Sequence, residues 1–363
     1  MRDEFFSFEL GICFEHEVVG MDLLKVKFPA EFVEGARNAV VTCLRVKPDE
    51  KVTVICDENT LTIAASIATE LERVKCRWNA FVLEEVGERP LKAMPAVVLE
   101  DMESSQVSIF AAQVQPNELR SRMDMTDVVN RRKMRHAHMV NITPEVMVEG
   151  MRADFEAVDR LSQVVSDKVR KATYVRATTP AGTDIRAEME PAYKWFKTSG
   201  IISTEKWGNL PGGECFTAPG EVNGVFVVDG VVGDFLCARY GILRETPLRI
   251  EIEENRITAV SCKNRQLEME FWSYTHTDAN SDRVGEFAIG TNIGVKKVIG
   301  NILQDEKFPG VHIAFGDPYG EHTGADWKST THIDVVGLEF DIWLGYEDGE
   351  EQIMSGGKFL VGA

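Results

Sequence analysis

ATYVRATTPAGTDIRAE, residues 172–188, is the stretch that decides the fold of this chain. Apolar and polar side chains alternate on both sides of Pro180-Ala181-Gly182, and Pro and Gly are typical of tight turns. Alternation with a period of two residues places one apolar face of each strand against a core, so we predict a β-hairpin here. The pattern of apolar and polar residues before this hairpin differs from the pattern after it.

Short apolar runs alternate with segments of helical spacing upstream of the hairpin. Strands are predicted at 52–56, 80–83, 107–111 and 139–142, and helices at 31–44, 63–73, 119–132 and 151–171. Strands separated by helices of this length imply crossover connections and a parallel sheet. Neither a G-x-G-x-x-G fingerprint nor a Walker-type G-K-[ST] sequence accompanies the strands, so a nucleotide site gets no support.

Downstream of the hairpin the sequence is dominated by β patterns. They recur at 224–232, 248–252, 257–262 and 332–345. We therefore predict two domains. Residues 1–171 form an α/β domain with a largely parallel sheet, and residues 172–363 form a β-rich α+β domain.

Composition narrows the classes of function. The 363 residues include 40 Lys+Arg and 58 Asp+Glu, for a net charge of −18, which argues against nucleic acid as a partner because phosphate contacts need a basic face. No run of 18 apolar residues exists, so no membrane span is expected. Seven cysteines without a C-x-x-C pair, and a start at Met1-Arg2-Asp3-Glu4 that is unlike a signal peptide, favour a cytoplasmic protein.

The closest spacing of metal-ligand types is His332-Ile333-Asp334 within a strand-like run. Residues two apart on a strand project from the same face, so His332 and Asp334 converge on one spot. Imidazole and carboxylate groups that converge are a recurrent start of a metal site. The alternative is a partly buried histidine that is hydrogen-bonded to a neighbour, with Asp334 in solvent.

Three other segments strengthen the metal interpretation. His312 lies among apolar strand residues, where an unpaired imidazole would be costly, and Glu286 opens another apolar run. Glu214 lies in a loop rich in Gly and Pro. Each of these carboxylates alone is often a surface or capping group. Together the oxygen and nitrogen ligands suit a divalent cation, and no set of thiolates accompanies them.

The same segments carry a family resemblance. In order along the chain they are GGECFTAP at 212–219, GEFAIGTN at 285–292, GNILQDEK at 300–307, VHIAFGDPY at 311–319 and HID at 332–334. This ordered set resembles the M29 metallo-aminopeptidases of the thermophilic aminopeptidase T type. VKPDEKV at 46–52 resembles the start of that family as well, so the similarity spans most of the chain.

The resemblance implies a ligand set, an activity and an assembly. The residues that match metal ligands of the family are Glu214, Glu286, Glu306, His312, His332 and Asp334. Glu306 stands six residues before His312, one more than the family spacing leads us to expect. Family members hold two divalent ions, usually zinc, cobalt or magnesium. They act on peptides and form homodimers that enclose the active sites.

The implied chemistry is that of a two-metal hydrolase. Two cations can share a carboxylate, for which we choose Glu286, lower the pKa of a bridging water and polarise the scissile carbonyl. Glu214, or a carboxylate that is not a ligand, would move the proton of the water to the leaving amine. Tyr319 matches the active-site tyrosine of the family and would donate a hydrogen bond to the oxyanion. Its alternative role is a loop aromatic packed beside Pro318.

A second activity stays open because the chain is short for this peptidase family. A shorter branch with the same fold includes dihydroxypyridine dioxygenases, which cleave an aromatic ring with one Fe(II) held by two His and one Asp. Here His332 and Asp334 would supply two ligands, and His276 or His312 the third. A third possibility is a metal-binding scaffold without activity. The remaining histidines that lack ligand partners nearby in sequence are expected to be structural: His16, His136 and His138.

Overall fold

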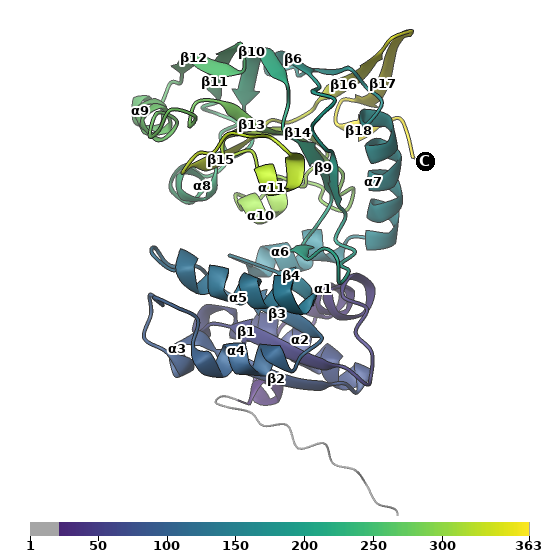
Figure 1. Ribbon diagram of the computed structural model, residues 1–363, viewed down its shortest axis with the longest axis vertical. Helices are drawn as coiled ribbons and strands as arrows, with labels where there is room; N and C mark the ends of the chain where they lie inside the picture. The colour runs from purple at the N-terminus through teal and green to yellow at the C-terminus, as the bar shows by residue number, and fades with distance from the viewer. Residues whose placement is uncertain (1–21, 363) are drawn as a thin grey trace, which may run out of the picture.

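The computed structural model describes residues 22–362, so Cys13, His16 and the start at Met1 lie outside the described residues. The chain folds into two lobes (Figure 1). The first lobe is built on a five-stranded sheet, and the second on an eight-stranded sheet and another five-stranded sheet. In the described part of the chain, no helix is long and apolar enough to cross a membrane.

All strands of the first sheet run parallel, in the order β2-β1-β3-β4-β8. They are β1 (Lys51–Cys56), β2 (Arg77–Val82), β3 (Val107–Ala111), β4 (Arg135–His138) and β8 (Gly208–Asn209). The helices of this lobe are α1 (Phe32–Arg37), α2 (Leu61–Val74), α3 (Leu83–Val86), α4 (Ala96–Glu103), α5 (Leu119–Arg132) and α6 (Pro144–Val148). The predicted parallel sheet with crossover helices is confirmed.

Several predicted elements of the first half differ in their bounds from the structure. The strand predicted at 80–83 is Arg77–Val82, and the helix predicted at 31–44 is α1 followed by a π-helix over Asn38–Cys43. The fourth strand is Arg135–His138 and not 139–142. Two histidines of this strand are buried, and a pattern that counts histidine as polar does not recognise them as core residues. The predicted helix at 151–171 is shorter, because α7 spans Phe155–Val169. The Asp154 side chain accepts a hydrogen bond from the Ala157 N–H and so caps a new helix start.

The second lobe begins with the predicted hairpin, which is confirmed as β5 (Tyr174–Thr178) paired with β6 (Asp184–Glu188). The hairpin lies in the antiparallel sheet of order β12-β11-β10-β6-β5-β16-β17-β18. The other strands of that sheet are β10 (Glu221–Val228), β11 (Leu248–Glu253), β12 (Arg256–Ser261), β16 (Asp341–Tyr346), β17 (Gly349–Ser355) and β18 (Lys358–Phe359). The predicted fold class, an α/β first half and a β-rich α+β second half, is therefore confirmed.

The five-stranded antiparallel sheet of the second lobe has the order β15-β14-β13-β9-β7. Its strands are β7 (Phe196–Thr198), β9 (Glu214–Thr217), β13 (Val284–Gly290), β14 (Gly310–Gly316) and β15 (His332–Val336). The helices of this lobe are α8 (Asp234–Tyr240), α9 (Arg265–Tyr274), α10 (Ile302–Asp305) and α11 (Gly320–Thr323). In Figure 1, α10 and α11 lie below this sheet, on the side of the first lobe.

Helix α7 links the two hydrophobic cores. Phe155 and Val158 pack in the core of the first lobe, while Leu161, Val165 and Val169 pack in the core of the second. The chain also returns to the first lobe after the hairpin, since β8 pairs with β4 at the edge of the parallel sheet. The domain boundary between residues 171 and 172 stays a prediction.

Candidate metal centre

One face of the sheet formed by β7, β9, β13, β14 and β15 gathers five of the predicted ligands. Glu286 and Asp334 both lie opposite Ala314. His312 is two residues from Ala314 on β14, and His332 is two residues from Asp334 on β15. Glu214 pairs with Gly290 on β13, four residues beyond Glu286. Because cross-strand partners and every second residue share a face, all five side chains project from the same side.

The opposite face of this sheet is apolar. The residues adjacent to the ligands, Cys215, Phe287, Ile313, Ile333 and Val335, all lie in the core of the second lobe. A change of register at Gly285 interrupts the pairing of β13 with β14 just before Glu286. A Cβ atom on Gly285 would lie 2.6 Å from the Gly316 carbonyl oxygen, so this β-bulge requires glycine. The bulge brings Glu286 opposite Ala314 on the ligand face.

Glu286 lies between the two imidazoles. Its Oε1 atom is 3.4 Å from His312 Nε2, and its Oε2 atom is 3.9 Å from His332 Nε2. A second carboxylate approaches the same nitrogen of each ring. Glu214 Oε2 is 3.6 Å from His312 Nε2, and Asp334 Oδ1 is 3.5 Å from His332 Nε2.

The donor set fits a divalent cation. Two groups have ligand atoms that all lie within 4.8 Å of one another: Glu214, Glu286 and His312, and Glu306, His312 and Asp334. His312 is 1 % exposed, and its Nε2 atom has no hydrogen-bond partner among the described residues. An unpaired buried nitrogen is costly, and a metal ion would satisfy it. His332 Nδ1 lies 2.9 Å from the Asp317 carbonyl oxygen, so a proton on Nδ1 leaves Nε2 free to ligate.

A lysine that the sequence analysis missed lies inside the cluster. Lys307 is 1 % exposed, and its Nζ atom lies 2.7 Å from Glu214 Oε1 and 2.5 Å from Glu306 Oε1. The Thr198 hydroxyl also donates to Glu214 Oε1, at 2.8 Å. Each carboxylate thus has one oxygen bound by the ammonium and a second oxygen available to a cation. A lysine is rarely this buried, so its residue type does not indicate a position inside the cluster. The signal that could have found it is its place at the end of GNILQDEK, residues 300–307.

The carboxylates raise the pKa values of both histidines. Burial favours the neutral rings, but Asp334 and Glu286 outweigh it at His332 and raise its pKa to about 10. At His312, Glu286 and Glu214 likewise outweigh the effect of burial and raise the pKa. A raised pKa favours the protonated ring, so a metal ion must compete with a proton at each of the two histidines.

The four carboxylates of the cluster respond in two ways. Burial raises the pKa of Glu306 to about 8, with a further contribution from Asp334, and it also raises the pKa of Glu286. Burial also acts on Glu214 and Asp334, but their cationic neighbours outweigh it and lower the pKa. Lys307 is that neighbour for Glu214, and His332 for Asp334. The cluster therefore combines four carboxyl groups with one lysine and two histidines.

Tyr319 lies at the rim of the centre, immediately before α11. Its ring centroid is 4.4 Å from that of His332, and the residue is 44 % exposed. Loss of water around the hydroxyl, together with the negative charges of Asp334 and Glu286, raises its pKa well above the ordinary value. The phenol therefore keeps its proton and can donate it in a hydrogen bond.

The histidines outside this cluster are placed differently. His276 is exposed at the end of α9, where its ring stacks on Trp272 at 3.9 Å. It is absent from both groups of ligand atoms in the described residues, so His312 is the better third ligand for a site with two His and one Asp. His136 and His138 are buried in the first lobe and contact each other.

A sequence profile of the thermophilic metalloprotease (M29) family matches residues 148–359, more than half of the chain. Among curated proteins, none matches the sequence.

Two solved structures share the fold of this chain. One is wild-type AmpT from Thermus thermophilus, with a TM-score of 0.67 and 17% identity, covering 91% of this chain and 99% of AmpT. Another is 2,5-dihydroxypyridine dioxygenase from Pseudomonas putida KT2440, with a TM-score of 0.65 and 17% identity, covering 91% and 97%. Identity this low shows the fold alone.

Proposed function

The chain belongs to the thermophilic metalloprotease (M29) family, and we propose that it is a metal-dependent aminopeptidase that hydrolyses N-terminal residues from short peptides. The observation that carries the proposal is the position of Glu286, with one carboxylate oxygen facing His312 and the other facing His332. A carboxylate with two imidazoles on opposite sides suits a bridging ligand between two ions.

The two halves of the centre would each hold one ion in this proposal. Glu214, Glu286 and His312 would form one half. His332, which Glu286 and Asp334 flank, would form the other, with Glu306 added because its ligand atom lies within 4.8 Å of that of Asp334. Divalent ions such as zinc, cobalt or magnesium would supply a water of lowered pKa and would polarise the scissile carbonyl.

The side chains around the ions would bind and orient the peptide. The excess of carboxylates would seat the positively charged α-amino group of the substrate. Lys307 keeps Glu214 ionised, which supports Glu214 as the acceptor of the water proton and its carrier to the leaving amine. Tyr319 keeps its phenolic proton and would donate a hydrogen bond to the oxyanion of the tetrahedral intermediate.

Turnover of aminoacyl p-nitroanilides with added Co²⁺ or Zn²⁺ tests the proposal. Glu286→Gln keeps the shape of the side chain and removes its charge, so it should abolish metal-dependent turnover. Glu347→Gln, at an exposed position in the turn between β16 and β17, is the matched control and should behave as the wild type. The proposal fails if no metal supports turnover, or if wild type and Glu286→Gln are equally active.

A ring-cleaving Fe(II) dioxygenase is the second candidate. The observation in its favour is that one cluster contains His312, His332 and Asp334, a set with two His and one Asp. It predicts O₂ uptake with a dihydroxylated pyridine or a catechol after anaerobic loading with Fe²⁺. No uptake across such substrates would remove it. Metal binding without turnover in either assay would support an inactive scaffold.

The assembly and location belong to the same proposal. The resemblance to the peptidase family supports a homodimer, which light scattering after gel filtration would detect as twice the mass of 40.6 kDa. A cytoplasmic location is supported by the six described cysteines, which form no disulfide with one another. We expect neither nucleic acid nor a membrane as a partner.

A further inference from the structure

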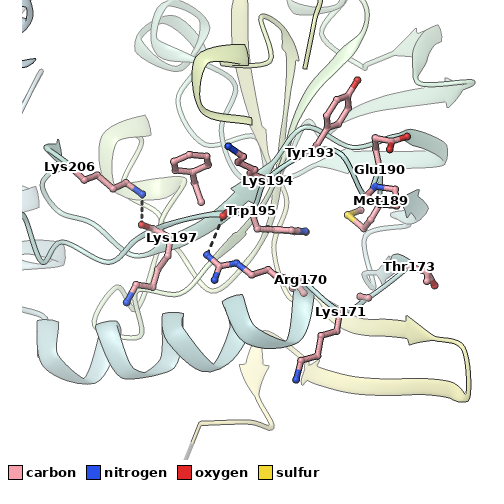
Figure 2. Close-up of a pocket in the computed structure, with 14 residues that line it drawn as sticks. Arg170, Lys171, Thr173, Met189, Glu190, Tyr193, Lys194, Trp195, Lys197 and Lys206 are labelled. Carbon is pink, nitrogen blue, oxygen red and sulfur yellow. Dashed lines mark hydrogen bonds between the residues drawn. The ribbon is translucent and has the colours of Figure 1, made fainter. Parts of the chain in front are cut away.

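A cavity of about 810 Å³ lies at the edge of the ligand-bearing sheet (Figure 2). Its wall combines the end of α7, the segment that leads into β7, and Lys206 from the loop after β7. In Figure 2 the side chains of Arg170, Lys194 and Lys206 come from these three separate parts of the chain. None of the predicted metal ligands lines this cavity.

The charge of the cavity wall is opposite to that of the whole protein. Its charged residues are Arg170, Lys171, Lys194, Lys197, Lys206 and Glu190. The chain as a whole carries a net charge of −18. Of the five cations, Lys197 is paired with Asp159 at 2.9 Å, and the other four have no carboxylate partner among the described residues. A concave surface with several unpaired cations favours an anionic ligand.

Two of these cations are held in place by backbone oxygens. Lys206 Nζ donates to the Lys197 carbonyl at 2.6 Å and lies 4.7 Å from the centre of the Phe196 ring. The Arg170 guanidinium donates to the Trp195 carbonyl at 3.3 Å. These contacts fix the positions of both cations without neutralising their charges.

The cavity borders the metal centre through β7. Phe196 and Lys197 line the cavity, and the next residue, Thr198, donates its hydroxyl to Glu214. Phe196 lies on the ligand face, because it pairs with Phe216 two residues after Glu214. The rings of Phe196 and Phe216 are stacked at 5.7 Å, and Phe196 also contacts His322 of α11 at 5.2 Å. An aromatic surface therefore connects the cavity to the metal centre.

The distance between the cavity and the metal centre matches the length of a short peptide. Strand β7 is two strands from β13 and three from β14, which carry Glu286 and His312. Neighbouring strands are roughly 4.8 Å apart, so the separation is about 10–15 Å. An extended peptide rises about 3.3 Å per residue, so about four residues would span it.

We propose that this basic cavity binds the C-terminal carboxylate of the substrate, and so selects peptides of about four residues that have a free carboxyl end. The inference rests on the proposed aminopeptidase function, because the α-amino end of the same peptide lies at the metal centre. The peptide backbone crosses the aromatic surface of Phe196 and Phe216, and its terminal carboxylate meets Lys206, Arg170 and Lys194.

Hydrolysis of a tetrapeptide with a free carboxyl end, compared with the same tetrapeptide as its amide, tests the selection. The wild type should cleave the free acid with a kcat/KM about tenfold higher, which corresponds to one charge-assisted contact of about 1.4 kcal/mol. Lys206→Met and Lys194→Met should each reduce that ratio toward one. Lys263→Met changes an exposed lysine outside the cavity and should keep the wild-type ratio. A wild-type ratio of one overturns the proposal.

Binding without turnover separates this proposal from the proposed function. Isothermal titration of metal-free protein with an N-acetylated tetrapeptide should give tighter binding for the acid than for the amide, and Lys206→Met should remove the difference. That result supports the cavity even if no hydrolysis is found in any assay. Equal binding of acid and amide overturns it. The same titration is then repeated in the presence of inorganic phosphate. If phosphate competes with the peptide acid, the result supports one shared site for the carboxylate. If phosphate binds without competing, the proposal is overturned.

Discussion

Two pairs of histidines in this protein have opposite electrostatic environments. His136 and His138 lie on β4 in the first lobe, whereas His312 and His332 lie on β14 and β15 in the second. In the first pair, His136 Nδ1 contacts the Ser108 hydroxyl at 2.8 Å, and His136 Nε2 contacts His138 Nδ1 at 3.2 Å. Burial lowers the pKa of His136 to about 3.

In the second pair His312 is buried and His332 is partly buried, and carboxylates surround both rings. Asp334 and Glu286 reverse the effect of burial and raise the pKa of His332 to about 10. No carboxylate lies within ion-pair distance of His136 or His138 in the described part of the chain. Burial without nearby carboxylates therefore favours a neutral histidine with a structural role in the core. Carboxylates clustered around a histidine instead make it a candidate metal ligand.

Removal of one histidine from each pair should give the largest contrast. His312→Gln removes a nitrogen that can ligate a metal, so the affinity for Zn²⁺ or Co²⁺ should fall more than about 100-fold. His136→Gln should leave that affinity unchanged. Titration calorimetry measures both. Equal metal affinities of His312→Gln and His136→Gln would contradict the difference between the two histidine pairs.

Lys307→Met tests how the carboxylates of the second pair are stabilised. The variant leaves Glu214 and Glu306 without their shared ammonium, and breaking such a buried ion pair costs about 3–5 kcal/mol. Urea unfolding of the metal-free protein should show this loss, and an added divalent ion should restore part of it. Lys263→Met should stay within about 0.5 kcal/mol of the wild type. A similar loss in both variants would contradict the role of Lys307.

The pH dependence of stability should have opposite signs for the two pairs. The pKa of His332 is raised, so its contribution in the metal-free protein is complete below about pH 6.5 and is lost as the pH rises toward 10. The pKa of His136 is lowered, so the folded state loses stability as the pH falls from about 6.5 toward 3. Urea midpoints across pH measure both slopes. His332→Gln should flatten only the alkaline slope, and an unchanged slope would refute this assignment.

The smallest effect is expected in the first pair. His136→Phe keeps an aromatic ring beside Trp207 but leaves the Ser108 hydroxyl without its partner. An unpaired buried hydroxyl costs about 1–3 kcal/mol, which unfolding in urea would detect. The metal content should not change. A loss of metal in this variant would show that the two pairs are coupled.

The sequence predicted the fold wherever the side-chain pattern was simple. The hairpin at β5 and β6 and strand β3 at Val107–Ala111 occur where alternation or an apolar run indicated them. Strand β4 was misplaced because its sequence, RHAH, has polar letters although three of its four residues are buried. Periodicity cannot recognise a histidine that packs against Phe110 and Trp207.

The candidate metal centre was also predictable only in part. A strand period of two placed His332 and Asp334 on one face, and the ordered motifs supplied the other residues that the structure brings near them. The burial of Lys307 could not be foreseen from its residue type, because only the contacts with Glu214 and Glu306 make that burial tolerable. The cavity beside β7 is formed by three distant segments and has no local signature.

Metal analysis of protein purified without added metal tests the central claim most directly. We predict two divalent ions per chain in the wild type and in Glu347→Gln, and loss of both ions in Glu286→Gln, whose carboxylate is the proposed bridge. One iron per chain would favour the dioxygenase. Wild-type protein that binds no ion, or a metal content unaffected by Glu286→Gln, would contradict a metal centre built around Glu286.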